Sequence, residues 1–127
     1  MGKRIKGILI TPHLGQKDVD YKVVTLYSPT MLEQLYEKLH TDCVEVIYRR
    51  VCDISVEIWC DEEGKLKKDP IIVGTGISQR GEFVEILVGT IFICTTTKNG
   101  ASESLTDEQI ETISKHLDEL YEFEYEV

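Results

Sequence analysis

The residues of this chain that could do chemistry are scattered and form no catalytic motif. Its three histidines, His13, His40 and His116, stand far apart, and its four cysteines include no Cys-x-x-Cys pair. A zinc site or an activated nucleophile needs such groups brought together. The nucleophile-elbow and phosphate-loop spacings are also missing. We therefore expect a protein that is not an enzyme, with no catalytic residue, metal site or cofactor.

One stretch carries residues suited to holding a nucleotide rather than reacting with it. Trp59 alternates with Ile54, Val56 and Ile58, so it lies on the more polar face of a predicted strand. An indole can stack on a base while guanidinium groups hold phosphates. The alternative is that Trp59 packs beneath a helix and the arginines are solvated. The predicted ligand-binding residues are Trp59, Arg49, Arg50, Tyr48, Arg80, Thr96 and Asn99.

The elements that position these residues begin with two strands and a helix. Residues 6–11 and 21–27 are rich in β-branched and aromatic residues, which is typical of strands. Ser28-Pro29 is a helix-start signal. An apolar stripe at helical spacing follows, and it predicts a helix over residues 29–40.

The middle of the chain changes to a period of two. Residues 43–60 alternate in two runs around a turn centred on Val51 and Cys52, which predicts a hairpin with Cys43 opposite Cys60. Residues 66–76 read as a loop that includes Gly74-Thr-Gly76. Residues 82–97 form a second hairpin-like block, whose apolar run predicts a strand buried on both faces.

The C-terminal helix, predicted over residues 106–121, has the best-defined start. Thr106 and Gln109 have the spacing of a capping box, and Leu105 and Ile110 that of a hydrophobic staple. Its apolar face is predicted to comprise Ile110, Ile113, Leu117, Leu120 and Tyr121.

These elements predict one α+β domain over residues 1–127. It has a mostly antiparallel sheet of about five to six strands and two helices, and 127 residues suffice for one core. No apolar run reaches the length of a membrane span, and no signal peptide is recognisable. We expect a cytoplasmic protein with reduced cysteines that does not bind membranes.

The net charge of −9 is concentrated at the C-terminal end. Residues 101–127 hold nine acidic residues and one basic residue, Lys115, whereas residues 1–100 are nearly neutral. Such a segment disfavours nucleic-acid binding, which needs clustered Lys and Arg. It indicates either a solvated helix face or an acidic surface that imitates DNA or meets a basic partner.

Four segments together resemble the domain-of-unknown-function 3846 family. They are Val44–Tyr48, Ile58–Leu66, Ile86–Cys94 and Ser104–Ile110. The resemblance implies a small protein carried by phages, plasmids and other mobile elements of bacteria, which places it in the bacterial host cytoplasm. Proteins in that setting often act against host defences, so this implication is one of context and not of chemistry.

Three functions follow as hypotheses. The first is a counter-defence protein that sequesters a small nucleotide immune signal without converting it, as a homo-oligomer. The second is an acidic DNA mimic or protein-binding inhibitor of a host defence enzyme. The third is a structural or interaction module without a ligand.

Overall fold

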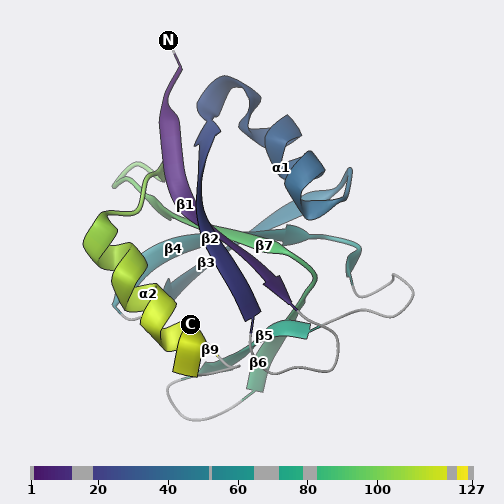
Figure 1. Ribbon diagram of the computed structural model, residues 1–127, viewed down its shortest axis with the longest axis vertical. Coiled ribbons are helices and arrows are strands. Elements are labelled where there is room, and N and C mark those ends of the chain that lie inside the picture. The colour runs from purple at the N-terminus through teal and green to yellow at the C-terminus, as the bar shows by residue number, and fades with distance from the viewer. Residues whose placement is uncertain are drawn as a thin grey trace.

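A twisted sheet of six strands forms the centre of the molecule, with one helix on each of its faces (Figure 1). The computed structural model describes residues 2–12, 19–51, 53–64, 72–78, 83–119 and 123–125. The elements in chain order are β1 (Arg4–Pro12), β2 (Val19–Tyr27), the 3-10 turn η1 (Ser28–Thr30), α1 (Met31–Leu39), β3 (Val44–Val51), β4 (Ile54–Asp61), β5 (Ile72–Ser78), β6 (Phe83–Val88), β7 (Ile91–Thr96), β8 (Ser102–Glu103), α2 (Asp107–Glu119) and β9 (Phe123–Tyr125).

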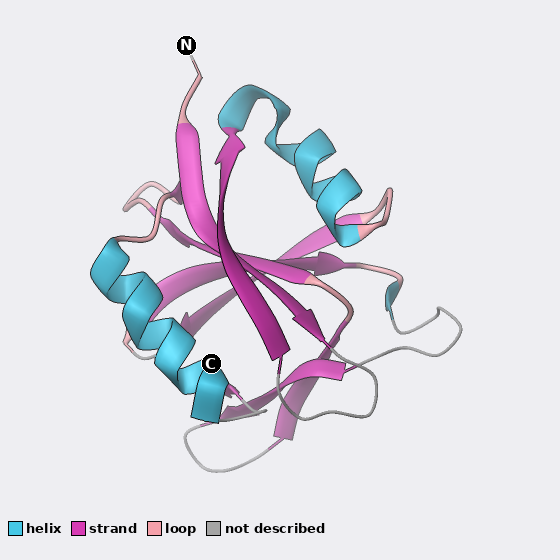
Figure 2. Cartoon of the chain, in the orientation of Figure 1, coloured by secondary structure: helices cyan, strands magenta, loops and turns pink. Residues whose placement is uncertain are grey.

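The strands divide into two sheets (Figure 2). The larger sheet has the order β2-β1-β7-β4-β3, with the short β8 paired to β7, and all of its pairs are antiparallel. The smaller sheet has the order β6-β5-β9, in which β9 runs parallel to β5. The predicted fold class, α+β with a mostly antiparallel sheet and two helices, is confirmed.

The two faces of the large sheet bury two separate apolar clusters. Directly paired residues share a face, so Ile8, Ile93 and Ile58 line up across three strands. This row belongs to the cluster that also contains Ile113 of α2. The opposite face carries Phe92, which packs in the cluster formed with α1. Both helices therefore use their apolar stripe to cover one face of the sheet.

Strand β7 is buried on both faces, as its apolar run predicts. Ile91 and Ile93 belong to the α2-side cluster, and Phe92 and Cys94 to the α1-side cluster. The prediction that residues 82–97 form a hairpin is wrong, because β6 and β7 belong to different sheets. Gly89, at φ 75°, lies between them, and this conformation lets the chain leave one sheet and enter the other.

The hairpin of β3 and β4 is confirmed, but its predicted register is wrong. Val51 pairs with Ile54, so the turn lies between these two residues, and Cys60 lies opposite Glu45. A two-residue hairpin turn requires positive φ, which Asp53 adopts at 62°. Cys43 lies before β3, and both Cys43 and Cys60 are free thiols.

The first helix starts later than the Ser28-Pro29 signal predicts. Residues 28–30 form the 3-10 turn, and the residue at the cap of α1, Thr30, makes no capping hydrogen bond with its side chain. His40 ends α1 in the left-handed conformation at φ 54°. Residues 72–78, which include Gly74-Thr-Gly76, form strand β5 and are not the predicted loop.

Candidate functional site

Trp59 is part of the packing on the α1 side of the sheet. It pairs with Val46 on one neighbouring strand and with Phe92 on the other, and its ring packs against the cluster beneath α1. Its indole Nε1 donates a hydrogen bond to Glu57 Oε1 at 3.1 Å. The alternative anticipated for Trp59, packing beneath a helix, is the arrangement found.

The residues predicted to accompany Trp59 lie on both faces of the hairpin. Tyr48 and Arg50 share its face, since they pair with Glu57 and Ser55, and both are exposed. Arg49 pairs with Val56 and so lies on the α2 face, where it is half-buried. Its Nη1 donates to the carbonyl oxygen of Tyr48 at 2.8 Å.

The remaining predicted residues are elsewhere. Asn99 is exposed in the turn between β7 and β8, where its N–H donates to Thr97 Oγ1 at 3.3 Å. Arg80 lies outside the described residues. Thr96, at the end of β7, lines a groove. The described members of the predicted set therefore do not converge on one site.

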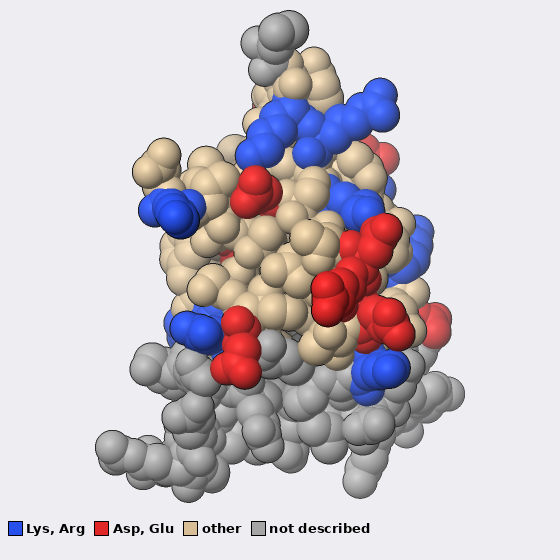
Figure 3. Space-filling model, turned by 90° about the vertical axis from the view of Figure 1, so that its left-hand side faces the viewer, with Lys and Arg blue, Asp and Glu red and all other residues tan. Residues whose placement is uncertain are grey.

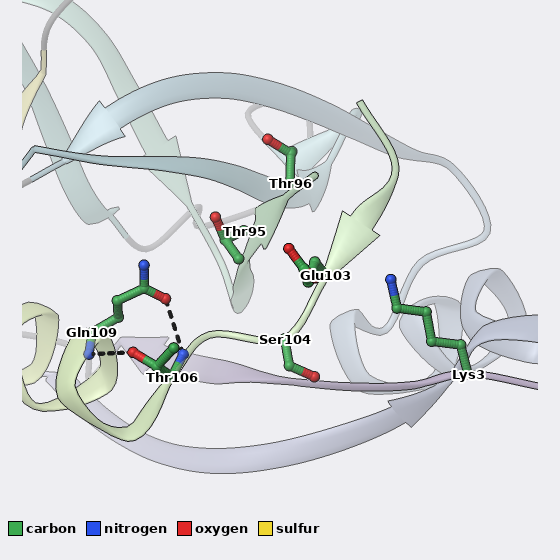
Figure 4. A pocket seen from close by; sticks show the side chains of 7 residues that line it. All are labelled: Lys3, Thr95, Thr96, Glu103, Ser104, Thr106 and Gln109. Carbon is green, nitrogen blue, oxygen red and sulfur yellow. Dashed lines mark hydrogen bonds between the residues drawn. The ribbon is translucent and has the colours of Figure 1, made fainter. Parts of the chain in front are cut away.

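That groove is the candidate site, and we call it the α2 groove. It has a volume of about 450 Å³, within the usual range for small-molecule pockets. It lies where the start of the chain, the β7–β8 pair and the beginning of α2 meet (Figure 4). Every lining residue has a polar side chain, and these residues are Lys3, Thr95, Thr96, Glu103, Ser104, Thr106 and Gln109.

The wall formed by α2 is held by the predicted capping box. Gln109 N donates to Thr106 Oγ1 at 3.1 Å, and Thr106 N donates to Gln109 Oε1 at 2.9 Å. Leu105 is buried beside the partly buried Ile110, as a hydrophobic staple requires. The side-chain NH₂ of Gln109 points away from Thr106 (Figure 4). A rigid helix start thus presents an amide donor to the groove.

Two hydroxyls of the lining are used to build the fold. Ser104 Oγ accepts from Lys6 N at 2.8 Å and donates to the carbonyl oxygen of Arg4 at 3.2 Å, which ties the groove to β1. Thr95 Oγ1 donates to the carbonyl oxygen of Ser55 at 2.6 Å. These two residues therefore shape the groove, and their hydroxyls have little capacity left for a ligand.

Four groups of the lining remain available to a ligand. The Thr96 hydroxyl, the Glu103 carboxylate and the Gln109 NH₂ have no hydrogen-bond partner among the described residues. The Lys3 ammonium donates to the carbonyl oxygen of Ser102 at 3.1 Å and keeps two further N–H donors. The lining residues thus offer a cation, an anion and an amide, together with the Thr96 hydroxyl, which lies on the α1 side of β7 because Thr96 pairs with Ser102.

Charge near the groove decides where an anion would bind. Lys6 Nζ pairs with Asp107 Oδ1, and this hydrogen bond lowers the pKa of Asp107. Asp107 and Glu108 in the first turn of α2 already offset the positive end of the helix dipole. Figure 3 shows this side of the molecule, with basic side chains at the top and along both edges and acidic ones mainly on the right. Lys3, and not the helix terminus, is the group that attracts an anion.

A buried polar cluster lies on the α1 face, away from the groove lining. Glu57 is 2% exposed, and its Oε1 accepts hydrogen bonds from Trp59 Nε1, from Cys94 Sγ at 3.3 Å and from Ser102 Oγ at 2.6 Å. Burial and the nearby Glu57 carboxylate raise the pKa of the Cys94 thiol. Cys94 is therefore a protonated donor and not a nucleophile.

Sequence reasoning missed this cluster and most of the groove. Glu57 reads as an exposed strand residue, because its distant partners come from β7 and from β8, a strand of only two residues. Lys3 belongs to no local sequence motif. It reaches the groove only because the start of β1 lies beside the residues that join β8 to α2. Two predictions located part of the site: the capping spacing of Thr106 and Gln109, and the choice of Thr96 as a ligand-binding residue.

In the part of the chain that the structure describes, no group of three His, Cys, Asp or Glu side chains is arranged to hold a metal ion. Nor is any helix there both long enough and apolar enough to cross a membrane.

Comparison with known proteins gives one match. Neither the curated proteins nor the solved structures include one that matches the chain. The family model of the domain of unknown function DUF3846 matches residues 5–118, which span β1 to the C-terminal part of α2. Because this match covers most of the chain, including six of the seven groove residues, the protein belongs to the DUF3846 family.

Proposed function

We propose that the protein is a non-catalytic binding protein that holds a small ligand of the nucleotide class in the α2 groove. The observation that carries the proposal is the set of available groups around one pocket-sized space. Lys3 suits a phosphate, while Glu103, Thr96 and Gln109 suit the hydroxyls and amine or amide edges of a nucleoside. This assignment places the ligand in the α2 groove and not at Trp59 and Arg49, where the sequence pattern predicts it.

The chemistry of the lining supports binding without conversion. The described cysteines, Cys43, Cys60 and Cys94, are not among the groove residues, and neither is His40. Covalent catalysis needs a nucleophile next to a base that activates it. The lining offers hydroxyls without such a base in contact, so a ligand held there would leave unchanged.

The family resemblance supplies the biological setting of the proposal. A mobile-element protein that holds a nucleotide without converting it would act by sequestering a signal of the host's defence. Under this proposal the protein works in the cytoplasm of the bacterial host and needs neither a membrane nor nucleic acid.

Isothermal titration against cyclic nucleotides and ADP-ribose derivatives tests the proposal. We expect saturable uptake, with the ligand recovered unchanged after denaturation. Lys3→Ala, Thr96→Val and Glu103→Gln should each weaken affinity roughly tenfold or more, as expected when a hydrogen bond to a charged or buried group is lost. Lys98→Ala, which removes an exposed lysine outside the groove, is the matched control and should change nothing.

Two outcomes of this titration contradict the proposal. Conversion of the ligand would make the protein an enzyme. The three groove variants could instead bind the nucleotide as tightly as the wild type, while Trp59→Phe or Arg50→Ala loses affinity. The ligand-binding site would then be on the β3–β4 hairpin.

A second function is favoured by the charge of α2. Asp107 is 92% exposed, and Glu111 reaches Lys115 only at 3.8 Å in an exposed pair. Such exposed ion pairs contribute little to stability, so the acidic face of α2 stays available to a basic partner. An inhibitor that binds a basic protein surface through α2 should lose affinity steeply with salt. Its binding should also fall in Glu108→Gln/Glu111→Gln, which should leave nucleotide uptake intact.

A further inference from the structure

Strand β8 consists of only Ser102 and Glu103, and Glu103 lines the α2 groove. The strand pairs with the last two residues of β7. Thr97 N donates to the carbonyl oxygen of Ala101 at 2.8 Å, and hydrogen-bonded pairs alternate along an antiparallel ladder. The next pair, Thr96 and Ser102, is therefore one whose main-chain groups point away from each other. The N–H and C=O of Ser102 face away from β7.

The outward carbonyl oxygen of Ser102 holds the ammonium of Lys3. Lys3 Nζ donates to it at 3.1 Å, and this is the ammonium's one hydrogen bond in the part of the chain that the structure describes. Lys3 is exposed and precedes β1, and its side chain extends towards β8 (Figure 4). A lysine side chain is a flexible four-carbon stem, so the position of this ammonium depends on its acceptor.

The side chain of Ser102 is anchored in the protein interior. Its hydroxyl donates to Oε1 of the buried Glu57 at 2.6 Å. The same oxygen accepts from Trp59 and from Cys94, which pack on the α1 side of the sheet. A carboxylate held by three donors in a packed cluster is a fixed point. Ser102 therefore links a fixed group of the core to an exposed cation of the groove.

We propose that Ser102 is a positioning residue of the α2 groove. It does not line the groove, so it acts without touching the ligand. Its hydroxyl fixes β8 on Glu57, and its carbonyl then holds the Lys3 ammonium where that ammonium meets a phosphate. This role rests on the proposed function, in which Lys3 is the phosphate-binding group. Ser102 should accordingly affect the binding of the phosphate and not that of the nucleoside.

NMR titration, which also follows weak binding, tests this role with cyclic AMP, cyclic GMP, adenosine and guanosine. Ser102→Ala should weaken the binding of both cyclic nucleotides roughly fivefold or more, because the bond from Lys3 to the phosphate is no longer held in place. The two nucleosides have no phosphate, and their affinities should not change. An equal loss for nucleotides and nucleosides would mean that Ser102 only maintains the shape of the groove, and it would overturn the proposal.

Three further variants make the titration specific. Ser102→Thr keeps the hydroxyl and should bind as the wild type does. Ser55→Ala removes an exposed serine hydroxyl from β4 and is the matched control. In the Lys3→Ala background, Ser102→Ala should cause no further loss, since both residues act through one contact. Additive losses in this double variant would overturn the proposal.

Reductive methylation of the ligand-free protein measures the same contact without a nucleotide. Lys3 should react about twofold faster or more in Ser102→Ala than in the wild type, because a hydrogen-bonded ammonium is less available to the reagent. The rate at the exposed Lys98 should not change, and mass spectrometry of the peptides measures both rates. An unchanged rate at Lys3 would overturn the role of Ser102. A wild type that binds none of the four ligands would instead refute the proposed function, and the methylation rates would still decide whether Ser102 holds Lys3.

Discussion

At the scale of single residues, Glu57 is the most constrained polar group that the structure describes. One oxygen of this buried carboxylate accepts from an indole, a thiol and a hydroxyl that come from β4, β7 and β8. A buried acceptor of this kind stabilises the fold only while its donors are satisfied. It fixes the position of β8, whose next residues line the α2 groove.

Replacing Glu57 with Leu should therefore destabilise the protein. Leucine leaves three buried donors without their acceptor, and we expect a loss of about 1–3 kcal/mol in the free energy of unfolding. Urea denaturation followed by the fluorescence of Trp59 measures it. Glu33→Leu, on the exposed side of α1, should stay within about 0.5 kcal/mol of the wild type. Equal stability of the two variants would contradict the role given to Glu57.

Cys43 allows a second test at this scale. Its Sγ lies 2.7 Å from Glu62 Oε2, and this hydrogen bond is the main cause that raises the pKa of Cys43 to about 11. Glu62→Gln should lower the pKa and raise the thiolate fraction near pH 8. Alkylation at Cys43 should then become roughly tenfold faster or more, as followed by mass spectrometry of its peptide. An unchanged rate would show that Glu62 does not control this thiol.

At the scale of elements, the start of α2 connects local sequence to the candidate site. The same two residues, Thr106 and Gln109, cap the helix and line the groove. Thr106→Ala should lower the free energy of unfolding by about 1 kcal/mol because the Gln109 N–H loses its acceptor. Thr112→Ala in the same helix should be neutral or slightly stabilising, since alanine has the higher helix propensity. Chemical denaturation of the two variants compares them directly, and equal losses would argue against the cap.

The ion pair of Lys6 and Asp107 joins this helix start to β1. The pair lowers the pKa of Asp107 in the folded state. Its stabilisation is therefore present above the pKa that Asp107 has in the unfolded chain, and it is lost as the pH falls through the lower, folded pKa. Asp107→Asn should lower the urea midpoint at neutral pH, and the gap from the wild type should close as the pH falls through the folded-state pKa of Asp107. A difference in urea midpoint that stays constant with pH would rule out the Lys6–Asp107 pair as the cause of the difference.

Sequence patterns predicted the elements well wherever local chemistry determines them. The capping spacing placed α2, the period of two placed β3 and β4, and the apolar run identified β7 as buried on both faces. Errors arose where long-range pairing decides. The turn between Val51 and Ile54 differs from the predicted one and shifts the hairpin register, and the assignment of β6 and β7 to different sheets depends on partners far away in the chain.

At the scale of the whole molecule, the groove exists because of contacts that no local pattern contains. Lys3 at one end of the chain and Gln109 near the other come to line one groove only after β1, β7 and β8 have assembled. The residues that were predicted to bind the ligand do not lie together, for a related reason. Trp59 is used for packing beneath α1, and the two arginines of the hairpin lie on opposite faces of the sheet.

The same assembly leaves the α2 groove without a function in the fold itself, because the groove holds polar groups that no other part of the described chain satisfies.

The most direct test is mass spectrometry of the small molecules that the protein carries. The wild type and the Thr96→Val/Glu103→Gln variant are purified in parallel from bacterial cells with active defence signalling, denatured, and compared for released ligand. We predict an intact nucleotide in near-stoichiometric amount from the wild type and a large deficit from the variant. Equal amounts from both proteins, or no nucleotide from the wild type, would contradict the assignment of the α2 groove as a nucleotide-binding site.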